Sequence, residues 1–182
     1  MRRMDYSNLV DYYKKLEEVS AKLEKTRILA KLFKEVSLNE LDKVVLLVQG
    51  TVFPKFTGYE LGIATQMMIR AISKAAGVSM DKIEKEFAKV GDLGLVAEKF
   101  IKEKKQVTLF TKKLTVEKVF KNLQELAFVT GVGSQERKLT LITELLVSAK
   151  PEEARYIVRT ILGELRVGVA EGLIRDAIVE AF

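Results

Sequence analysis

The sequence predicts an all-α protein. Apolar residues recur at intervals of three and four along almost every segment, which places them on one face of a helix. No segment shows the alternation of apolar and polar residues that is typical of a half-buried strand. The composition agrees, because 48% of the 182 residues are hydrophobic, 31% are charged and only 2 are proline. We expect about ten helices.

Six helices are predicted in the first half of the chain. The first begins after Ser7, whose hydroxyl suits an N-cap, and its apolar positions recur as far as Leu23. Ser79 and Asp92 are expected to cap the fifth and sixth helices, and Pro54 marks the loop before the fourth. The six helices are expected over about 7–23, 28–36, 37–50, 62–75, 79–90 and 92–101.

Four more helices are predicted after a lysine-rich connector at about 103–114. Thr115 and Ser134 are suitable caps for the seventh and eighth helices. Pro151 fits the first turn of the ninth, because proline lacks only an N–H that a helix leaves unbonded there. These helices are expected over about 115–126, 134–146, 151–163 and from 170 onward.

The chain also contains an internal repeat. Shifting the sequence by 113 positions superimposes the apolar residues of the second and third predicted helices on those of the eighth and ninth. A gap in the following loop then brings Gly62 over Gly172. We therefore predict two pseudo-symmetric helical subdomains, over about 25–102 and about 116–182, with the second copy truncated.

The composition excludes several kinds of chemistry. Without cysteine or histidine the chain has no disulfides, no thiolate nucleophile, no usual zinc ligands and no imidazole base. A net charge of +6 favours an anionic partner. No apolar run is long enough to span a bilayer, and no secretory signal is visible, so a cytoplasmic protein is expected.

Lysines concentrate in one part of the chain. Seven of them lie between Lys99 and Lys118, against two glutamates. Such a cluster is typical either of a solvated connector or of a strip that follows phosphates, and the sequence favours neither. Aromatic residues are not interleaved with these lysines, so stacking on single-stranded bases is not expected.

The stretch 153–172 combines a helix, a glycine break and the start of another helix. Arg155 and Arg159 are four residues apart and share one face of the first helix. The Leu-Arg-Val-Gly loop at 165–168 sets Arg166 beside backbone amides and a helix N-terminus, which suits a phosphate. The alternative is a plain helical hairpin with surface arginines.

Three other glycine breaks have the same character. Gly58–Gly62, Gly91–Gly94 and Gly131–Lys138 each open a helix, where glycine lets a phosphate approach and the helix dipole favours anions. Each alone is more typical of a loop and cap, and none is a phosphate-binding fingerprint. Gathered on one surface, such breaks would form a face that docks in the minor groove. The predicted DNA-binding residues are Gly91, Asp92, Leu93, Gly94, Gly131, Gly133, Ser134, Gln135, Arg137, Lys138, Arg166 and Gly168.

Together these motifs resemble the N-terminal DNA-binding domain of ATP-dependent DNA ligases of the archaeal and eukaryotic replicative type. The resemblance covers essentially the whole chain, and several motifs in the family's order are more specific than any single one. The motifs are residues 15–23, Gly58-Tyr59-Glu60-Leu61-Gly62, Gly91-Asp92-Leu93-Gly94, Gly133-Ser134 with Lys138, and Leu165-Arg166-x-Gly168-x-Ala170-Glu171.

The resemblance implies an all-helical domain with pseudo-twofold symmetry that grips nicked duplex DNA in the minor groove. In the parent enzyme it implies a catalytic core that follows this domain, ATP and magnesium as cofactors, and nick sealing in replication, repair and recombination. It also implies a cytoplasmic, nucleoid-associated protein without membrane contact, and it leaves contact with a sliding clamp open.

The catalytic part of such an enzyme is not visible in this sequence. The family's adenylated lysine lies in a Lys-x-Asp-Gly motif, and this sequence has no such tetrapeptide. No nucleotidyltransferase or OB-fold segment is recognised either, so no catalytic, cofactor-binding or metal-binding residue is expected here. The alternative function is an α-helical repeat scaffold that binds an acidic protein partner.

Overall fold

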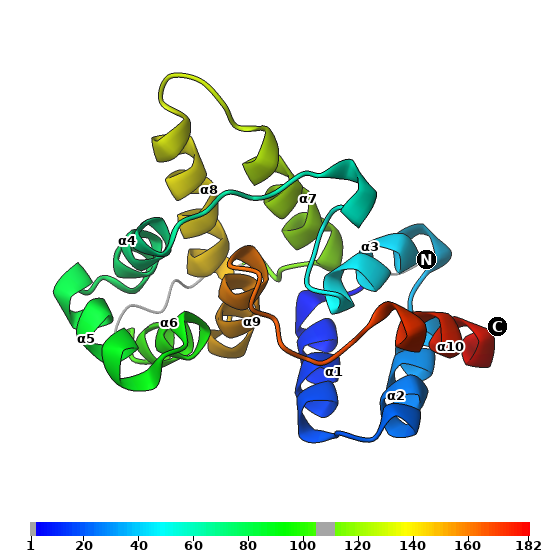
Figure 1. The fold of residues 1–182 in the computed structure, drawn as a ribbon. Coiled ribbons are helices and arrows are strands. Elements are labelled where there is room, and N and C mark those ends of the chain that lie inside the picture. The colour runs from blue at the N-terminus through cyan, green and yellow to red at the C-terminus, as the bar shows by residue number, and fades with distance from the viewer. Residues whose placement is uncertain (1–2, 105–111) are drawn as a thin grey trace.

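The computed structural model describes residues 3–104 and 112–182 and confirms the all-α prediction (Figure 1). Ten α-helices and one turn of 3-10 helix lie in these residues, which contain no strand beyond one isolated bridge. The elements are α1 (Tyr6–Glu18), α2 (Lys22–Glu35), α3 (Leu38–Val48), η1 (Lys55–Thr57), α4 (Thr65–Ala76), α5 (Met80–Val90), α6 (Leu93–Lys102), α7 (Val116–Phe128), α8 (Ser134–Ser148), α9 (Pro151–Ile161) and α10 (Glu171–Ala181).

The helix starts agree with the sequence at some positions and differ at others. The side chains of Ser79, Asp92 and Thr115 accept backbone hydrogen bonds at the starts of α5, α6 and α7, as predicted. Ser7 and Ser134 are not caps, because both lie inside the first turn of helices that begin without a side-chain cap. Periodicity locates a helix well, but it does not fix the first residue of its first turn.

The predicted long first helix is two helices. Val19 has an extended backbone, with φ −115° and ψ 142°, and ends α1 before the chain reverses into α2. Leu23 therefore belongs to α2, where it stays 62% exposed. The apolar spacing runs across this break because α1 and α2 pack on each other and both need an apolar face.

The helix bounds support the internal repeat. α9 begins and ends 113 residues after α3, and α7 begins and ends 110 residues after α1. The loop before the fourth helix corresponds differently from the prediction. Gly62 and Gly168 each lie three residues before a helix and have φ of 62° and 68°. Gly172 lies inside α10, so the predicted pairing of Gly62 with Gly172 is wrong by four residues.

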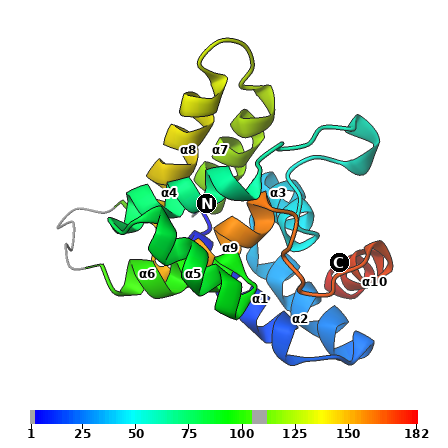
Figure 2. The same cartoon turned by 60° about the vertical axis from the view of Figure 1, so that its left-hand side comes forward.

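The two copies exchange their fourth helices. α4 packs mainly on α8, and its counterpart α10 packs mainly on α2. The α1–α2 and α7–α8 hairpins point in opposite directions, as a twofold relation requires (Figures 1 and 2). Neither copy therefore buries the second helix of its own hairpin without help from the other.

The pseudo-twofold axis passes near a short antiparallel bridge between the copies. Asp5 and Thr115 form this bridge, 110 residues apart like α1 and α7. The Tyr6 amide donates to the Leu114 carbonyl at 2.9 Å, and the Val116 amide donates to the Met4 carbonyl at 2.9 Å. The two hydrogen bonds are symmetry mates.

Helix α9 lies at the centre of the fold, and α6 packs on it more extensively than any other described helix pair. Gly94 permits the close approach, since a Cβ added there would lie 2.7 Å from the Arg155 carbonyl oxygen and 2.8 Å from Arg159 Cγ. This separation leaves no room for a side chain. The glycine at this position is therefore required by packing.

Arg159 joins three helices by ion pairs. Its Nη2 lies 2.8 Å from Asp92 Oδ2 at the start of α6, and its Nη1 pairs with Glu17 near the end of α1. Asp92 also accepts from the amides of Gly94 and Leu95. Burial alone would raise the pKa of the Asp92 carboxyl, but the hydrogen bonds and charge of Arg159, with these amides, outweigh burial and lower the pKa.

The first testable prediction concerns Gly94. We expect Gly94→Ala to destabilise the fold by about 1–3 kcal/mol, because the added methyl group meets the backbone of α9 and forces α6 outward. Gly172→Ala is the matched control: it holds the same second position of a helix, and an added Cβ there meets nothing within 4 Å. Equal urea midpoints for both variants would contradict the packing role of Gly94.

The second prediction concerns the Asp92–Arg159 pair. Because the folded pKa of Asp92 lies below its ordinary value, its stabilisation is complete above about pH 4 and is lost as the pH falls through the lowered pKa. Asp92→Asn should therefore lower the free energy of unfolding at pH 7 and lower it much less near pH 3.

Urea denaturation at both pH values measures this difference, with Asp81→Asn as control. Asp81 lies in an exposed pair with Lys85, where both side chains are at least 70% exposed, and such pairs contribute little. An effect of Asp92→Asn that is the same at both pH values would exclude the ionised carboxylate as the source of the stability.

Candidate nucleic-acid interface

The turn between α9 and α10 presents one arginine outward. Leu165 and Val167 are buried, while Arg166 between them is exposed. Arg166 has φ 55°, the one non-glycine residue with positive φ among the described residues. Leu165 lies against Gly50, where an added Cβ would come within 3.2 Å of Leu165 Cβ. The turn is thus fixed by two apolar side chains that hold the guanidinium on the surface.

A lysine from α2 completes this turn. Lys25 Nζ donates to the Val167 carbonyl at 2.8 Å and to the Gly168 carbonyl at 3.4 Å. Gly168 has φ 68° and lies three residues before α10, whose first-turn amides have no side-chain cap. Lys25 was not among the predicted site residues. The shift of 113 that reveals the repeat places it over Lys138, and that signal was available in the sequence.

The equivalent place in the other copy has the same parts. Gly62 has φ 62°, lies three residues before α4, and approaches the lysine of α8: its added Cβ would be 3.8 Å from Lys138 Nζ. We call Gly62, Lys138 and the N-terminus of α4 the first corner. Gly168, Lys25 and the N-terminus of α10 form the second corner. The exchange of fourth helices explains why each lysine comes from the other copy.

The start of α8 contributes further predicted residues around the first corner. Gly131, Gly133 and Gln135 are exposed, and Ser134 is half-buried. The Arg137 guanidinium donates to the Thr130 carbonyl at 2.8 Å and so stabilises the α7–α8 loop. Arg70 of α4 pairs with Glu136 of α8 at 2.9 Å, which ties the two helices of the first corner together.

The Gly91–Gly94 break serves mainly the core. Leu93 is 1% exposed and Gly94 is buried under α9, so these two predicted contacts are removed from the surface. Asp92 is engaged by Arg159 and by the α6 amides. Only Gly91 of this predicted group is exposed. The structure thus gives a packing and capping role to residues that the sequence assigned to DNA.

The other predicted cations divide in the same way. Arg155 lies in an ion pair with Glu98 at 2.6 Å, so neither arginine of α9 is free to meet a phosphate. Within the lysine cluster, Lys99 pairs with Glu86 at 2.9 Å. Lys105 lies outside the described residues.

The segment between α3 and α4 connects the two corners. It runs past α7 and α8 in Figure 1 before it enters α4. With the end of α9 it lines a hollow of about 600 Å³, whose residues include Gly62 of the first corner and Gly50, the neighbour of Leu165. Whether Gly91, the α8 start and the Arg166 turn all lie on one face stays a prediction.

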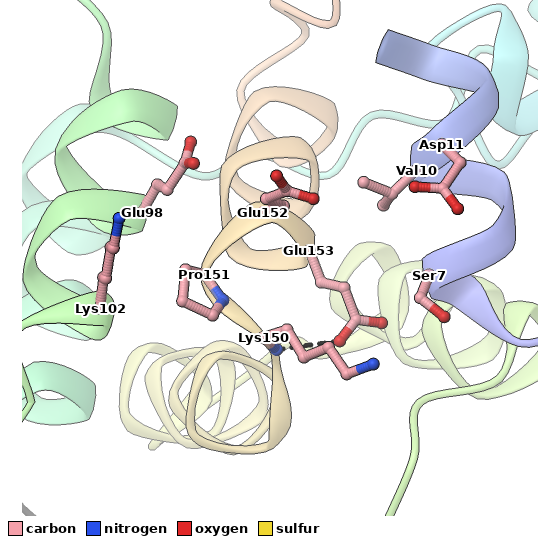
Figure 3. Close-up of a pocket in the computed structure, with 9 residues that line it drawn as sticks. All are labelled: Ser7, Val10, Asp11, Glu98, Lys102, Lys150, Pro151, Glu152 and Glu153. Carbon is pink, nitrogen blue, oxygen red and sulfur yellow. Dashed lines mark hydrogen bonds between the residues drawn. The ribbon is translucent and has the colours of Figure 1, made fainter. Parts of the chain in front are cut away.

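A second hollow, of about 500 Å³, lies between α1, α6 and α9 (Figure 3). Glu153 on its wall accepts from the Lys150 amide at 2.9 Å, and burial raises the pKa of its carboxyl. Glu152 pairs with Lys14, and Glu98 with Arg155. A lining with four carboxylates and two lysines does not suit the triphosphate of ATP, which carries several negative charges.

Two further searches of the described residues returned nothing. No group of three or more acidic side chains is arranged to hold a metal ion in the part of the chain that the structure describes. Across 3–104 and 112–182, none of the helices has the length and apolar character needed to cross a bilayer.

Comparison with known proteins identifies the family. The chain is 47% identical over 182 residues to a DNA ligase of Methanothermobacter thermautotrophicus, covering 100% of this chain and 33% of that protein. It is 46% identical over 179 residues to a DNA ligase of Nanoarchaeum equitans, covering 98% of this chain and 31% of that protein. The chain thus spans about a third of the length of these relatives. The family model for the DNA ligase N terminus matches residues 5–179, and the chain belongs to this family.

Proposed function

We propose that this chain binds nicked duplex DNA without sequence preference, through the minor groove and the phosphates, as the N-terminal module of an ATP-dependent DNA ligase. The observation that carries the proposal is the pair of equivalent corners. Each corner combines a glycine at positive φ, a lysine and the uncapped N-terminus of a fourth helix.

The physical argument starts from the symmetry of the ligand. The backbones of a DNA duplex are related by local twofold axes, so two equivalent cationic corners can meet phosphates of both strands in the same way. Helix N-termini and lysines attract phosphates whatever the base sequence. Glycine at the point of approach leaves room for the sugar–phosphate chain. Arg166 adds a guanidinium beside the second corner.

The role in the parent enzyme follows from the family. We propose that catalytic domains elsewhere in the parent chain bind ATP and magnesium and seal the nick in replication, repair and recombination. This chain would hold the duplex for them, in the cytoplasm and in association with the nucleoid. A sliding clamp is a further candidate partner of the parent.

The third prediction is salt-dependent duplex binding. If about four to six phosphates are neutralised, the logarithm of the association constant should fall with the logarithm of salt concentration at a slope of about −4 to −5. Lys138→Ala and Arg166→Gly should each flatten this slope by about one and weaken binding to all sequences alike. Glycine is chosen at Arg166 because it adopts φ 55° without strain.

Fluorescence anisotropy with nicked and intact duplexes of two unrelated sequences measures these quantities. Lys85→Ala is the control, since it removes the same charge from an exposed lysine of α5, away from both corners. A salt-independent affinity, or an equal loss from Lys85→Ala, would exclude the corners as phosphate sites. No duplex binding at all would favour the alternative, a helical scaffold for an acidic protein.

The fourth prediction concerns catalysis. The isolated chain should not become covalently labelled by radioactive ATP, because it has no Lys-x-Asp-Gly motif and its hollow between α1, α6 and α9 is lined by carboxylates. Labelling followed by denaturing electrophoresis tests this, with an intact DNA ligase as the positive control. A labelled band at the mass of the chain would contradict the prediction.

A further inference from the structure

Helices α3 and α9 occupy equivalent places, yet only α9 is covered on both sides. α9 packs on α1 and on α6. α3 packs on α7, the counterpart of α1, and among the described helices no counterpart of α6 packs extensively on it. One face of α3 is therefore without the partner that its symmetry mate has.

The uncovered face of α3 is apolar. Val158 and Arg159 of α9 are 0% and 9% exposed beneath α6. Their counterparts after the shift of 113 are Val45 and Leu46, which are only half-buried. Leu38, at the start of α3, is 72% exposed. We name Leu38, Val45 and Leu46, with Asp42 between them, the α3 face.

The end of this face borders a hollow. A space of about 370 Å³ lies beside Leu46 and is also lined by Gln49, Phe53, Phe56 and Glu171. Leu46 corresponds to Arg159, and Arg159 meets the first turn of α6. The hollow thus lies where the first turn of a helix equivalent to α6 would begin.

We propose that the α3 face binds a helix equivalent to α6, supplied by the segment of the parent chain that follows Phe182. In the first copy, α6 follows α4 after α5 and then packs on the third helix of the other copy. α10 is the counterpart of α4, and the relatives are about three times as long as this chain. The same route from α10 leads to α3.

The chemistry of the α3 face specifies this helix. α6 offers α9 a glycine at the closest approach, and acidic groups that pair with Arg155 and Arg159. In α3 these arginines are replaced by Asp42 and Leu46. The helix bound to the α3 face therefore carries a small residue at the crossing point, an apolar residue opposite Leu46 and a cation opposite Asp42.

Thiol labelling tests the proposal directly, because the chain contains no cysteine and any introduced thiol reacts without background. Leu38→Cys and Leu46→Cys are prepared both in residues 1–182 and in the full parent chain. We expect each thiol to react at least about tenfold more slowly in the parent, since labelling then requires local opening of the packed helix. Leu23→Cys on α2, where Leu23 is 62% exposed, is the control and should react equally in both chains.

Two outcomes would overturn the proposal. Equal reactivity of Leu38→Cys and Leu46→Cys in both chains would mean that no segment of the parent covers the α3 face. Protection within residues 1–182 that increases with protein concentration would mean that a second copy of the chain covers it. The labelling does not involve DNA, so its result is independent of whether the corners bind a duplex.

Discussion

The exchange of fourth helices is the constraint on which the rest of the structure depends. A helical hairpin such as α1–α2 has an apolar face that its own copy does not cover, and α10 of the other copy covers it. α4 does the same for α8. Because burial of apolar surface is the main source of stability, the two copies are expected to fold as one unit. The short bridge at Asp5 and Thr115 lies where the copies meet.

The exchange also builds the candidate interface. A fourth helix that crosses to the other copy must be preceded by a connecting segment, and each connecting segment turns at a glycine with positive φ before the helix starts. The helix on which it lands contributes Lys138 in one case and Lys25 in the other. A duplicated fold thereby yields two similar cationic corners without any direct selection of their spacing along the chain.

The two copies differ most in their third helices. α9 is closed by α6 and by the ion pairs of Arg159, whose partners Asp92 and Glu17 come from different helices. Removing one partner from such a half-buried pair leaves a charge with poor solvation, which is more costly than losing an exposed pair. α3 has Leu46 at the position of Arg159 and an open apolar face instead. The asymmetry is one of both chemistry and coverage.

The sequence by itself determined the helices, their order and the repeat. Periodicity located ten helices, and the shift of 113 matched the bounds of α3 and α9. These features depend on local spacing, which a sequence displays directly. The family was also recognised from ordered glycine and arginine motifs, and the comparisons agree with it.

Only the tertiary structure decided which polar residues face solvent. Arg159 and Asp92 are as charged as Arg166, but they meet each other across 67 residues of sequence and leave the surface. Gly94 resembles a flexible loop residue until α9 is seen 2.7 Å from the position of its missing side chain. Lys25 joins the second corner through a contact spanning 142 residues. Such long-range contacts depend on how helices cross, and helix crossing is set by the packing of the whole core.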